Sequence, residues 1–508
     1  MRNLSKLLFR RVVLVSLGIL LQIGAMLLFM VHLAELRPWF SVLMLLLRAF
    51  FVVYLVSARI DPSYKIAWLI LILAAPVAGV SIYLFMGGNR LSRREKKKMS
   101  RLTCLQDRHL REDPRIRIRL EQADLSAAGQ SLYLTRRAAS PLYDATATEY
   151  FPCGESCFPR MLEELQKAQH YIFLEYFIVE EGQMWGQILS VLQEKARAGV
   201  DVRLIYDDFG CITRLPANYP RLLRDFGISA RVFNPFIPVV SGRLNNRDHR
   251  KLMIIDGKAA FTGGINLADE YINHGSRFGY WKDAGLFLRG TAVWSMTMQF
   301  LSLWNYVSGT EDNLCTYFPG DCGTTVPGFV QPFADSPLDG ESVGQTVLLN
   351  LIGKARKRVY IMTPYLVLDD RVTTALCNAA KSGVDVRIVT PGIPDKWYVH
   401  AMTRANYTAL TAAGVRIFEF TPGFLHSKVF LADSSTAVVG TVNLDYRSLY
   451  LHFENGVWMY GTDSIRTISD DFARTFPRCR EITARDAGAV PLHIRAFRSV
   501  LQLFAPLM

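Results

Sequence analysis

The sequence predicts an α/β fold in which two similar halves follow N-terminal transmembrane helices. A His-x-Lys-x-x-x-x-Asp motif occurs twice, strand-like apolar runs alternate with helical stretches around each copy, and the beginning of the chain is unusually apolar. We divide the 508 residues into a membrane anchor (1–88), a basic juxtamembrane linker (89–135), a first half (136–325) and a second half (326–508).

The anchor contains three apolar segments. Val12–Val31 carries no charge over a length that can span a bilayer, and Ile66–Met86 is equally free of charge but contains Pro76. Between them, Trp39–Ala58 is interrupted by Arg48, and a charge at mid-bilayer is costly. We therefore expect the middle segment to be re-entrant or interfacial. A cleaved signal peptide fits less well, because further apolar segments follow the first.

Basic residues flank the apolar region on both sides, at positions 2–11 and 90–101. Positive flanks stay in the cytoplasm, so we expect an even number of crossings, with two as the preferred number and a cytoplasmic catalytic region. The net charge of +13 and the basic cluster at 90–101 suit an integral membrane protein that contacts anionic lipids, although topology marking explains the same cluster. Nucleic acid fits less well as a partner, because basic runs interleaved with aromatic residues are missing elsewhere.

The two halves repeat one order of elements: strand, helix, strand, helix, strand and then the motif hairpin. Gly199–Ile205 matches Gly383–Val389 almost letter for letter, and Tyr171–Phe177 matches Tyr360–Leu366. Alternating strands and helices predict a mixed sheet covered by helices in each half. We place the boundary between the halves in Pro319–Pro337, which is rich in glycine, proline and threonine.

The motif copies place the same three residues 177 positions apart: His249, Lys251 and Asp256, then His426, Lys428 and Asp433. A turn and an asparagine follow each copy, at Asn266 and Asn443. Residues two apart on a strand share a face, so histidine and lysine project together. The aspartates have the opposite parity and lie near a turn, which predicts a structural role within the motif. One copy alone could be a buried strand with a satisfied histidine, but a matched pair is hard to explain by chance.

Two imidazoles, two ammonium groups and two carboxamides around one point suit a phosphodiester whose charge grows in the transition state. One imidazole can attack phosphorus while the other protonates the departing oxygen. The sequence has neither a phosphate-binding P-loop nor an aspartate-rich metal motif. Lysine is also a poor metal ligand, so we expect a site without metal or cofactor, in which protein cations replace Mg²⁺.

The sequence around the motifs resembles that of bacterial cardiolipin synthases of the phospholipase D superfamily, and the resemblance extends over nearly the whole chain. The resemblance rests on the two motifs and on Gly263–Tyr271, Gly440–Ser448, Trp281-Lys282-Asp283 and Phe453-Glu454-Asn455. It implies two phospholipase D-like α/β halves related by pseudo-twofold symmetry, with the active site at their junction.

The resemblance also implies that Asp283 and Glu454 orient the two histidines, and that Asn266 and Asn443 contact substrate. Gly264 departs from the wider superfamily, in which many members have serine, whereas Thr441 keeps a hydroxyl in the second half. Six further residues are candidates for lining the cleft, with packing or surface roles equally open: Glu175, Tyr176, Asp207, Asp208, Tyr365 and Lys396.

We therefore predict a cardiolipin synthase. It converts two phosphatidylglycerols into cardiolipin and glycerol through a phosphatidyl-histidine intermediate, and an oligomer is possible. The nucleophile is left open, although family precedent leans to His249. One alternative is a hydrolytic phospholipase D or a nuclease, of which the membrane segments disfavour the nuclease. The other is a non-catalytic membrane scaffold, which has no need of two intact motifs.

Overall fold

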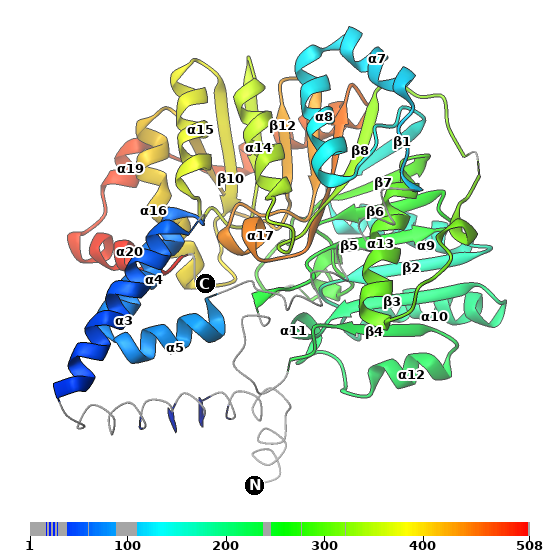
Figure 1. Ribbon diagram of the computed structural model, residues 1–508. Helices are drawn as coiled ribbons and strands as arrows, with labels where there is room; N and C mark the ends of the chain where they lie inside the picture. The colour runs from blue at the N-terminus through cyan, green and yellow to red at the C-terminus, as the bar shows by residue number, and fades with distance from the viewer. Residues whose placement is uncertain are drawn as a thin grey trace.

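The computed structural model describes residues 38–58, 60–87, 109–236, 245–275, 277–320 and 322–505, together with six isolated helical residues between 17 and 28. Its body consists of two mixed sheets, one formed by residues 146–290 and the other by residues 329–482 (Figure 1). Helices cover the outer faces of the sheets, and the helices of residues 293–308 and 464–475 contribute to the core that the sheets share.

The first sheet has seven strands in the order β1-β7-β6-β5-β2-β3-β4. Strands β2, β3 and β4 are parallel, and the remaining pairs are antiparallel. The strands are β1 (Thr146–Phe151), β2 (Tyr171–Tyr176), β3 (Asp201–Asp207), β4 (Ser229–Phe233), β5 (Lys251–Ile255), β6 (Ala259–Gly263) and β7 (Gly285–Gly290). The helices are α9 (Gly154–Gln166), α10 (Gln183–Arg197), α11 (Asp208–Cys211), α12 (Tyr219–Asp225) and α13 (Val293–Ser308).

The second sheet repeats this plan with one extra edge strand, in the order β15-β11-β10-β9-β12-β13-β14-β8. The strands are β8 (Phe329–Asp335), β9 (Arg358–Met362), β10 (Asp385–Pro391), β11 (Arg416–Phe420), β12 (Val429–Ala432), β13 (Thr436–Gly440), β14 (Glu454–Tyr460) and β15 (Cys479–Ile482). The helices are α14 (Val343–Lys354), α15 (Asp370–Lys381), α16 (Trp397–Ala412), α17 (Tyr446–Tyr450), α18 (Ser464–Thr475), α19 (Ala484–Gly488) and α20 (Leu492–Phe504). The predicted two α/β halves are confirmed.

A shared apolar core joins the two sheets. On β5, Leu252 and Ile254 enter this core, whereas Met253 and Ile255 enter a second core under the helices of the first half. This alternation is the period of two that a strand imposes on its side chains. Because every residue of β5 is buried, the sheet holds the residues at its end firmly in place.

Part of the predicted linker is folded. Residues 114–138 form α7 (Pro114–Ala123) and α8 (Leu125–Ala138), each begun by an aspartate whose side chain accepts backbone N–H groups. Helix α8 packs against α14 and β8, so this segment lies on the second sheet (Figure 1).

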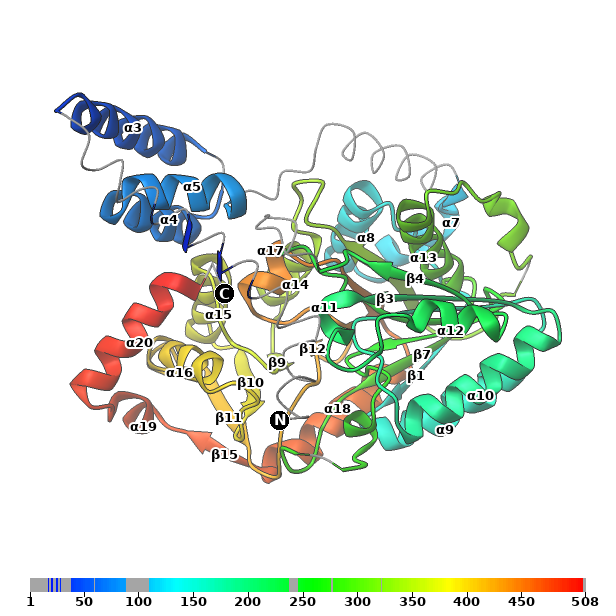
Figure 2. The same ribbon diagram turned by 90° about the horizontal axis from the view of Figure 1, so that it is seen from below.

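The N-terminal helices are α3 (Pro38–Ser57), α4 (Pro62–Ala74) and α5 (Pro76–Met86), and they project to one side of the body (Figure 2). Ile66–Met86 is not one continuous helix, because the chain is extended at Ala75 and Pro76 starts α5. Proline lacks a backbone N–H and disfavours helical geometry in the preceding residue.

Most of Val12–Val31 lies outside the described residues. In the part of the chain that the structure describes, none of the helices combines the length and apolar character needed to cross a membrane.

Candidate active site

The two motifs meet where the sheets come together, and each motif is bridged to the opposite half. The backbone N–H of His249, just before β5, donates to the Phe453 carbonyl at 2.9 Å. In the symmetry-related position, the N–H of His426 donates to the Lys282 carbonyl at 2.7 Å. These bridges place each histidine beside the residue that follows its partner in the other half, Glu454 or Asp283.

Each imidazole is consequently held by a carboxylate from the other half. His249 Nδ1 lies 3.0 Å from both oxygens of Glu454, which also accept hydrogen bonds from the Thr441 and Ser448 hydroxyls. His426 Nδ1 lies 2.7 Å from Asp283 Oδ2. A carboxylate on Nδ1 fixes the ring orientation and the tautomer, and it stabilises an imidazolium when one forms.

The Asp283 carboxylate also explains the glycine at position 264. Its Oδ1 accepts the Ala284 N–H at 2.8 Å, and it occupies the space that a side chain on Gly264 would need. A Cβ built at Gly264 would collide with Asp283 Oδ1. In the second half the equivalent residue is Thr441, whose hydroxyl contacts the carboxylate instead. The two histidines therefore have different supports.

Two buried lysines supply positive charge beside the histidines. Lys251 and Lys428 are each 1% exposed, and each ammonium donates to the carbonyl of the histidine in its own motif. Burial lowers the pKa of Lys251 to about 8, against the opposing effect of Glu454, and lowers the pKa of Lys428 to about 7.

Both imidazoles are disfavoured as cations while the cavity holds no anion. Burial, followed by the charge of Lys251, lowers the pKa of His249 well below its usual value. Burial and Lys428 lower the pKa of His426 to about 4, although Asp283 opposes the shift. A bound phosphodiester anion would raise both pKa values, because it favours nearby positive charge.

The two asparagines differ in what they offer. The Asn266 carboxamide accepts the Ile178 N–H at 3.1 Å and donates to the Tyr271 hydroxyl at 2.7 Å. Asn443 Oδ1 has no hydrogen-bond partner among the described residues, and Asn443 lines the cavity. Asn443 therefore suits a contact with substrate more directly than Asn266 does.

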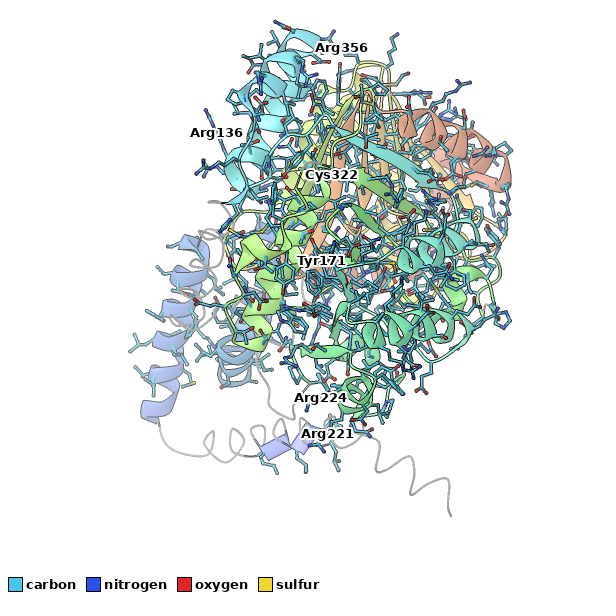
Figure 3. All side chains as sticks on the ribbon, turned by 90° about the vertical axis from the view of Figure 1, so that its right-hand side faces the viewer. Arg136, Tyr171, Arg221, Arg224, Cys322 and Arg356 are labelled. Carbon is cyan, nitrogen blue, oxygen red and sulfur yellow. The ribbon has the colours of Figure 1, made fainter. Side chains whose placement is uncertain are left out.

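The motif aspartates lie at the far ends of their strands, away from the imidazoles. The Asp256 carboxylate accepts three consecutive backbone N–H groups, those of residues 169–171, each at 2.8 Å. The Asp433 carboxylate accepts those of residues 356–358. Tyr171 is buried and is labelled near the middle of the view in Figure 3, whereas Arg356 is labelled near its upper edge. This geometry supports the structural role that strand parity predicts.

The histidines line a cavity of about 630 Å³, to which Asn266, Asn443 and two of the six cleft candidates, Tyr365 and Lys396, also contribute. The other four candidates lie elsewhere. Glu175 pairs with Arg250 at 2.7 Å, and Tyr176 packs in the first-half core. Asp207 and Asp208 accept backbone N–H groups of Phe209 and Phe236.

Sequence reasoning missed several polar residues that line this cavity, among them Arg247, Arg447 and His452. Each lies within a few positions of a motif landmark, since Arg247 precedes His249 by two residues and Arg447 follows Asn443 by four. Their proximity to the motifs was the feature of the sequence that could have identified these residues. These residues are not repeated between the halves, however, and a search for repeats passes over them.

One group of possible metal ligands occurs among the described residues. The donor atoms of His249, His452 and Glu454 lie within 4.8 Å of one another. Both Glu454 oxygens already accept hydrogen bonds from Thr441, Ser448 or His249. This donor set suits the orientation of an imidazole better than the binding of a metal ion.

Comparison with known proteins matches residues 161–276 and 348–476 to the family described as "Cardiolipin synthase, PLD-like domain". Residues 44–88 match "Phospholipase_D-nuclease N-terminal". A cardiolipin synthase of a Geobacillus species is 36% identical, over 88% of this chain and 89% of its own length. That of Geobacillus kaustophilus is 35% identical, over 92% and 94%.

An uncharacterized protein of Streptococcus mutans is 43% identical, over 90% of this chain and 99% of its own length. Among solved structures, phosphatidylserine synthase of Haemophilus influenzae superposes with a TM-score of 0.56 at 14% identity. The superposition covers 71% of this chain and 95% of that protein, and at this identity it shows a similar fold.

Proposed function

Because the chain belongs to the cardiolipin synthase family of phospholipase D-like proteins, we propose that it transfers a phosphatidyl group from one phosphatidylglycerol to another. The products are cardiolipin and glycerol. The observation that carries the proposal is the pair of imidazoles in one cavity, each held by a carboxylate of the opposite half. Phosphodiester exchange needs two such groups, one to bond phosphorus and one to move a proton.

In the first step, one imidazole attacks the phosphorus of the donor lipid. A P–N bond forms while the P–O bond to the headgroup glycerol breaks, and the departing oxygen takes a proton from the other imidazole. Lys251 and Lys428 stabilise the charge that grows on the phosphoryl oxygens. Asn443 lies in the same cavity, where its NH₂ group can donate to these oxygens.

In the second step, the glycerol hydroxyl of the acceptor lipid loses its proton to the imidazole that served as acid. Its oxygen forms a new P–O bond, and the P–N bond breaks. One phosphodiester replaces another, so no nucleotide energy source is required. Transfer prevails over hydrolysis when a bound lipid alcohol competes successfully with water.

The test is an assay of the purified full-length protein in mixed micelles of phosphatidylglycerol with a metal chelator. We expect cardiolipin and glycerol in equal amounts, and reversal when glycerol is added. His249→Gln and His426→Gln should each abolish both products, while Arg416→Gln, at an exposed ion pair, should not. Phosphatidic acid as the main product would favour a hydrolase, and a requirement for CDP-diacylglycerol would refute the assignment.

The N-terminal region attaches the enzyme to the bacterial cell membrane in this proposal, with the catalytic body in the cytoplasm and an even number of crossings. Two features support attachment. Helix α3 exposes a row of large apolar side chains: Val42, Leu43, Leu45, Leu46, Phe50, Val53 and Val56. Helix α20 contacts α4 and exposes Leu492, Phe497 and Val500.

The C-terminal end of α20 lies next to the catalytic cavity, since Ala505, directly after this helix, lines it. A reporter fused to the C-terminus should be active in the cytoplasm, and activity only on the outer face would refute this topology.

A further inference from the structure

The pseudo-twofold symmetry of the site breaks down at the rim of the cavity. The spacing that relates His249 to His426 also relates Arg247 to Phe424 and Glu270 to Arg447. Trp281 and His452 also correspond to each other, because each lies two residues before the orienting carboxylate of its half, Asp283 or Glu454. All six of these rim residues line the cavity. Residues at symmetry-related positions of the two halves therefore differ in chemistry, so the two sides of the cavity can bind different groups.

The side around His426 is aromatic. The His426 ring lies 5.4 Å from Trp281, 5.6 Å from Tyr271 and 5.9 Å from Phe424, measured between ring centroids. Two acids lie on this side: Asp283 holds His426, and Glu270 pairs with Arg214 at 3.1 Å. The rings that surround His426 are uncharged, and a further cation in the cavity lining is Arg277, whose guanidinium lies 5.4 Å from the Phe278 ring.

The side around His249 is basic. The His452 ring lies 5.7 Å from that of His249, and two arginines contribute to the same side from different halves of the chain. Arg247 is 2% exposed, donates a hydrogen bond of 2.8 Å to the Asn234 carbonyl and lies 3.6 Å from the Asp207 carboxylate. Arg447 is partly buried on α17.

Burial and charged neighbours have partly opposing effects on the pKa of Arg447. Burial lowers its pKa, the neighbouring Asp445 opposes this shift, and the charge of Arg247 lowers it further. Arg247 and Arg447 both line the cavity, and an anion bound near both guanidinium groups would offset the repulsion between them. Guanidinium groups bind phosphate through paired N–H donors, which makes them well suited to this task.

We propose that Arg247 and Arg447 form a second phosphate subsite, which binds the phosphodiester of the acceptor lipid while the reacting phosphodiester lies between the lysines. This inference rests on the proposed function. Cardiolipin carries two phosphates joined by a single glycerol, so the acceptor phosphate must lie close to the reacting phosphorus. The subsite selects an anionic lipid as acceptor and favours it over water or a neutral alcohol.

The test compares two acceptors for the same phosphatidyl-enzyme. Full-length protein is given phosphatidylglycerol with ethanol, an acceptor without phosphate, and cardiolipin and phosphatidylethanol are measured together. Arg447→Gln should lower the ratio of cardiolipin to phosphatidylethanol by roughly 10- to 100-fold, the range expected for losing a charged hydrogen-bonding partner. Formation of phosphatidylethanol should stay within about threefold of wild type, which also reports a folded enzyme.

Two control variants accompany this test. Arg416→Gln removes an exposed arginine that pairs with Glu481 and should leave the ratio unchanged, while Arg447→Lys should restore part of it. An equal loss of both products in Arg447→Gln would overturn the subsite, since the residue would then serve the donor step or the fold. An unchanged ratio would overturn it as well. If wild-type enzyme forms phosphatidylethanol but no cardiolipin, the proposed function itself fails.

Discussion

Replacement of Glu454 by glutamine tests the crossed arrangement of carboxylates and histidines. In the wild-type site, the two Glu454 oxygens accept hydrogen bonds from His249 and from the Thr441 and Ser448 hydroxyls. A glutamine side chain offers one acceptor oxygen and an NH₂ group in the same space, so some of these donors must reorient. If the NH₂ group faces His249 Nδ1, the ring proton moves to Nε2, the atom that has to react.

The expected loss follows from that tautomer change. Converting a buried, histidine-orienting carboxylate to an amide costs up to about 10⁴-fold in turnover, and we expect about 10³-fold here, equivalent to about 4 kcal/mol. The fold should be retained, because glutamine has nearly the same volume and Glu454 is the first residue of a fully paired strand, β14.

The assay is single-turnover release of glycerol and formation of cardiolipin by the full-length protein in phosphatidylglycerol micelles. Glu481→Gln provides a matched control at an exposed carboxylate that pairs with Arg416. Turnover of the Glu454→Gln enzyme within tenfold of wild type would refute the idea that this carboxylate sets the state of His249. So would an equal loss in the Glu481→Gln control.

Three further changes test other parts of the site. Because burial lowers the pKa of Lys428 to about 7 and that of Lys251 to about 8, the lysines lose charge as pH rises through this range, and kcat/KM should fall. Lys428→Arg should weaken this fall, because arginine keeps its charge. Identical pH profiles of kcat/KM for the variant and the wild type would contradict this. Gly264→Ala should destabilise the protein by about 1–3 kcal/mol in thermal unfolding, because its Cβ would collide with Asp283, and an unchanged midpoint would show that the site relaxes easily. Asp433→Asn should also cost about 1–3 kcal/mol of stability while leaving KM unchanged, and a raised KM would argue for contact with substrate.

The repeated features of the sequence predicted the repeated features of the structure. Buried strands such as β3 and β10 are encoded locally, in apolar runs that follow the glycine turns at Gly199 and Gly383. The period of two predicted a common direction for His249 and Lys251, although β5 begins only at Lys251. The same parity placed Asp256 away from the imidazoles, where its carboxylate in fact binds backbone N–H groups.

Features that depend on how the halves meet could not be read from the sequence. The partner of His249 is Glu454, 205 positions away, and only the docked sheets bring them together. The resemblance identified Asp283 and Glu454 as acids that orient histidines, but it did not say which acid serves which ring. The apolar content of Ile66–Met86 likewise predicted one segment, whereas Pro76 divides it into two helices.

The contrast between the centre and the rim of the cavity follows from the reaction itself. Exchange of one phosphodiester for another passes through the same kind of pentacoordinate arrangement in both steps, so a duplicated centre with a histidine and a lysine from each half serves both. The two lipids are nevertheless not equivalent, because one gives up its headgroup and the other keeps its phosphate intact. A symmetric rim would bind either lipid in either place. Arg247 stands where the second half has Phe424, and Arg447 stands where the first half has Glu270. These differences remove that ambiguity without altering the residues that perform the chemistry.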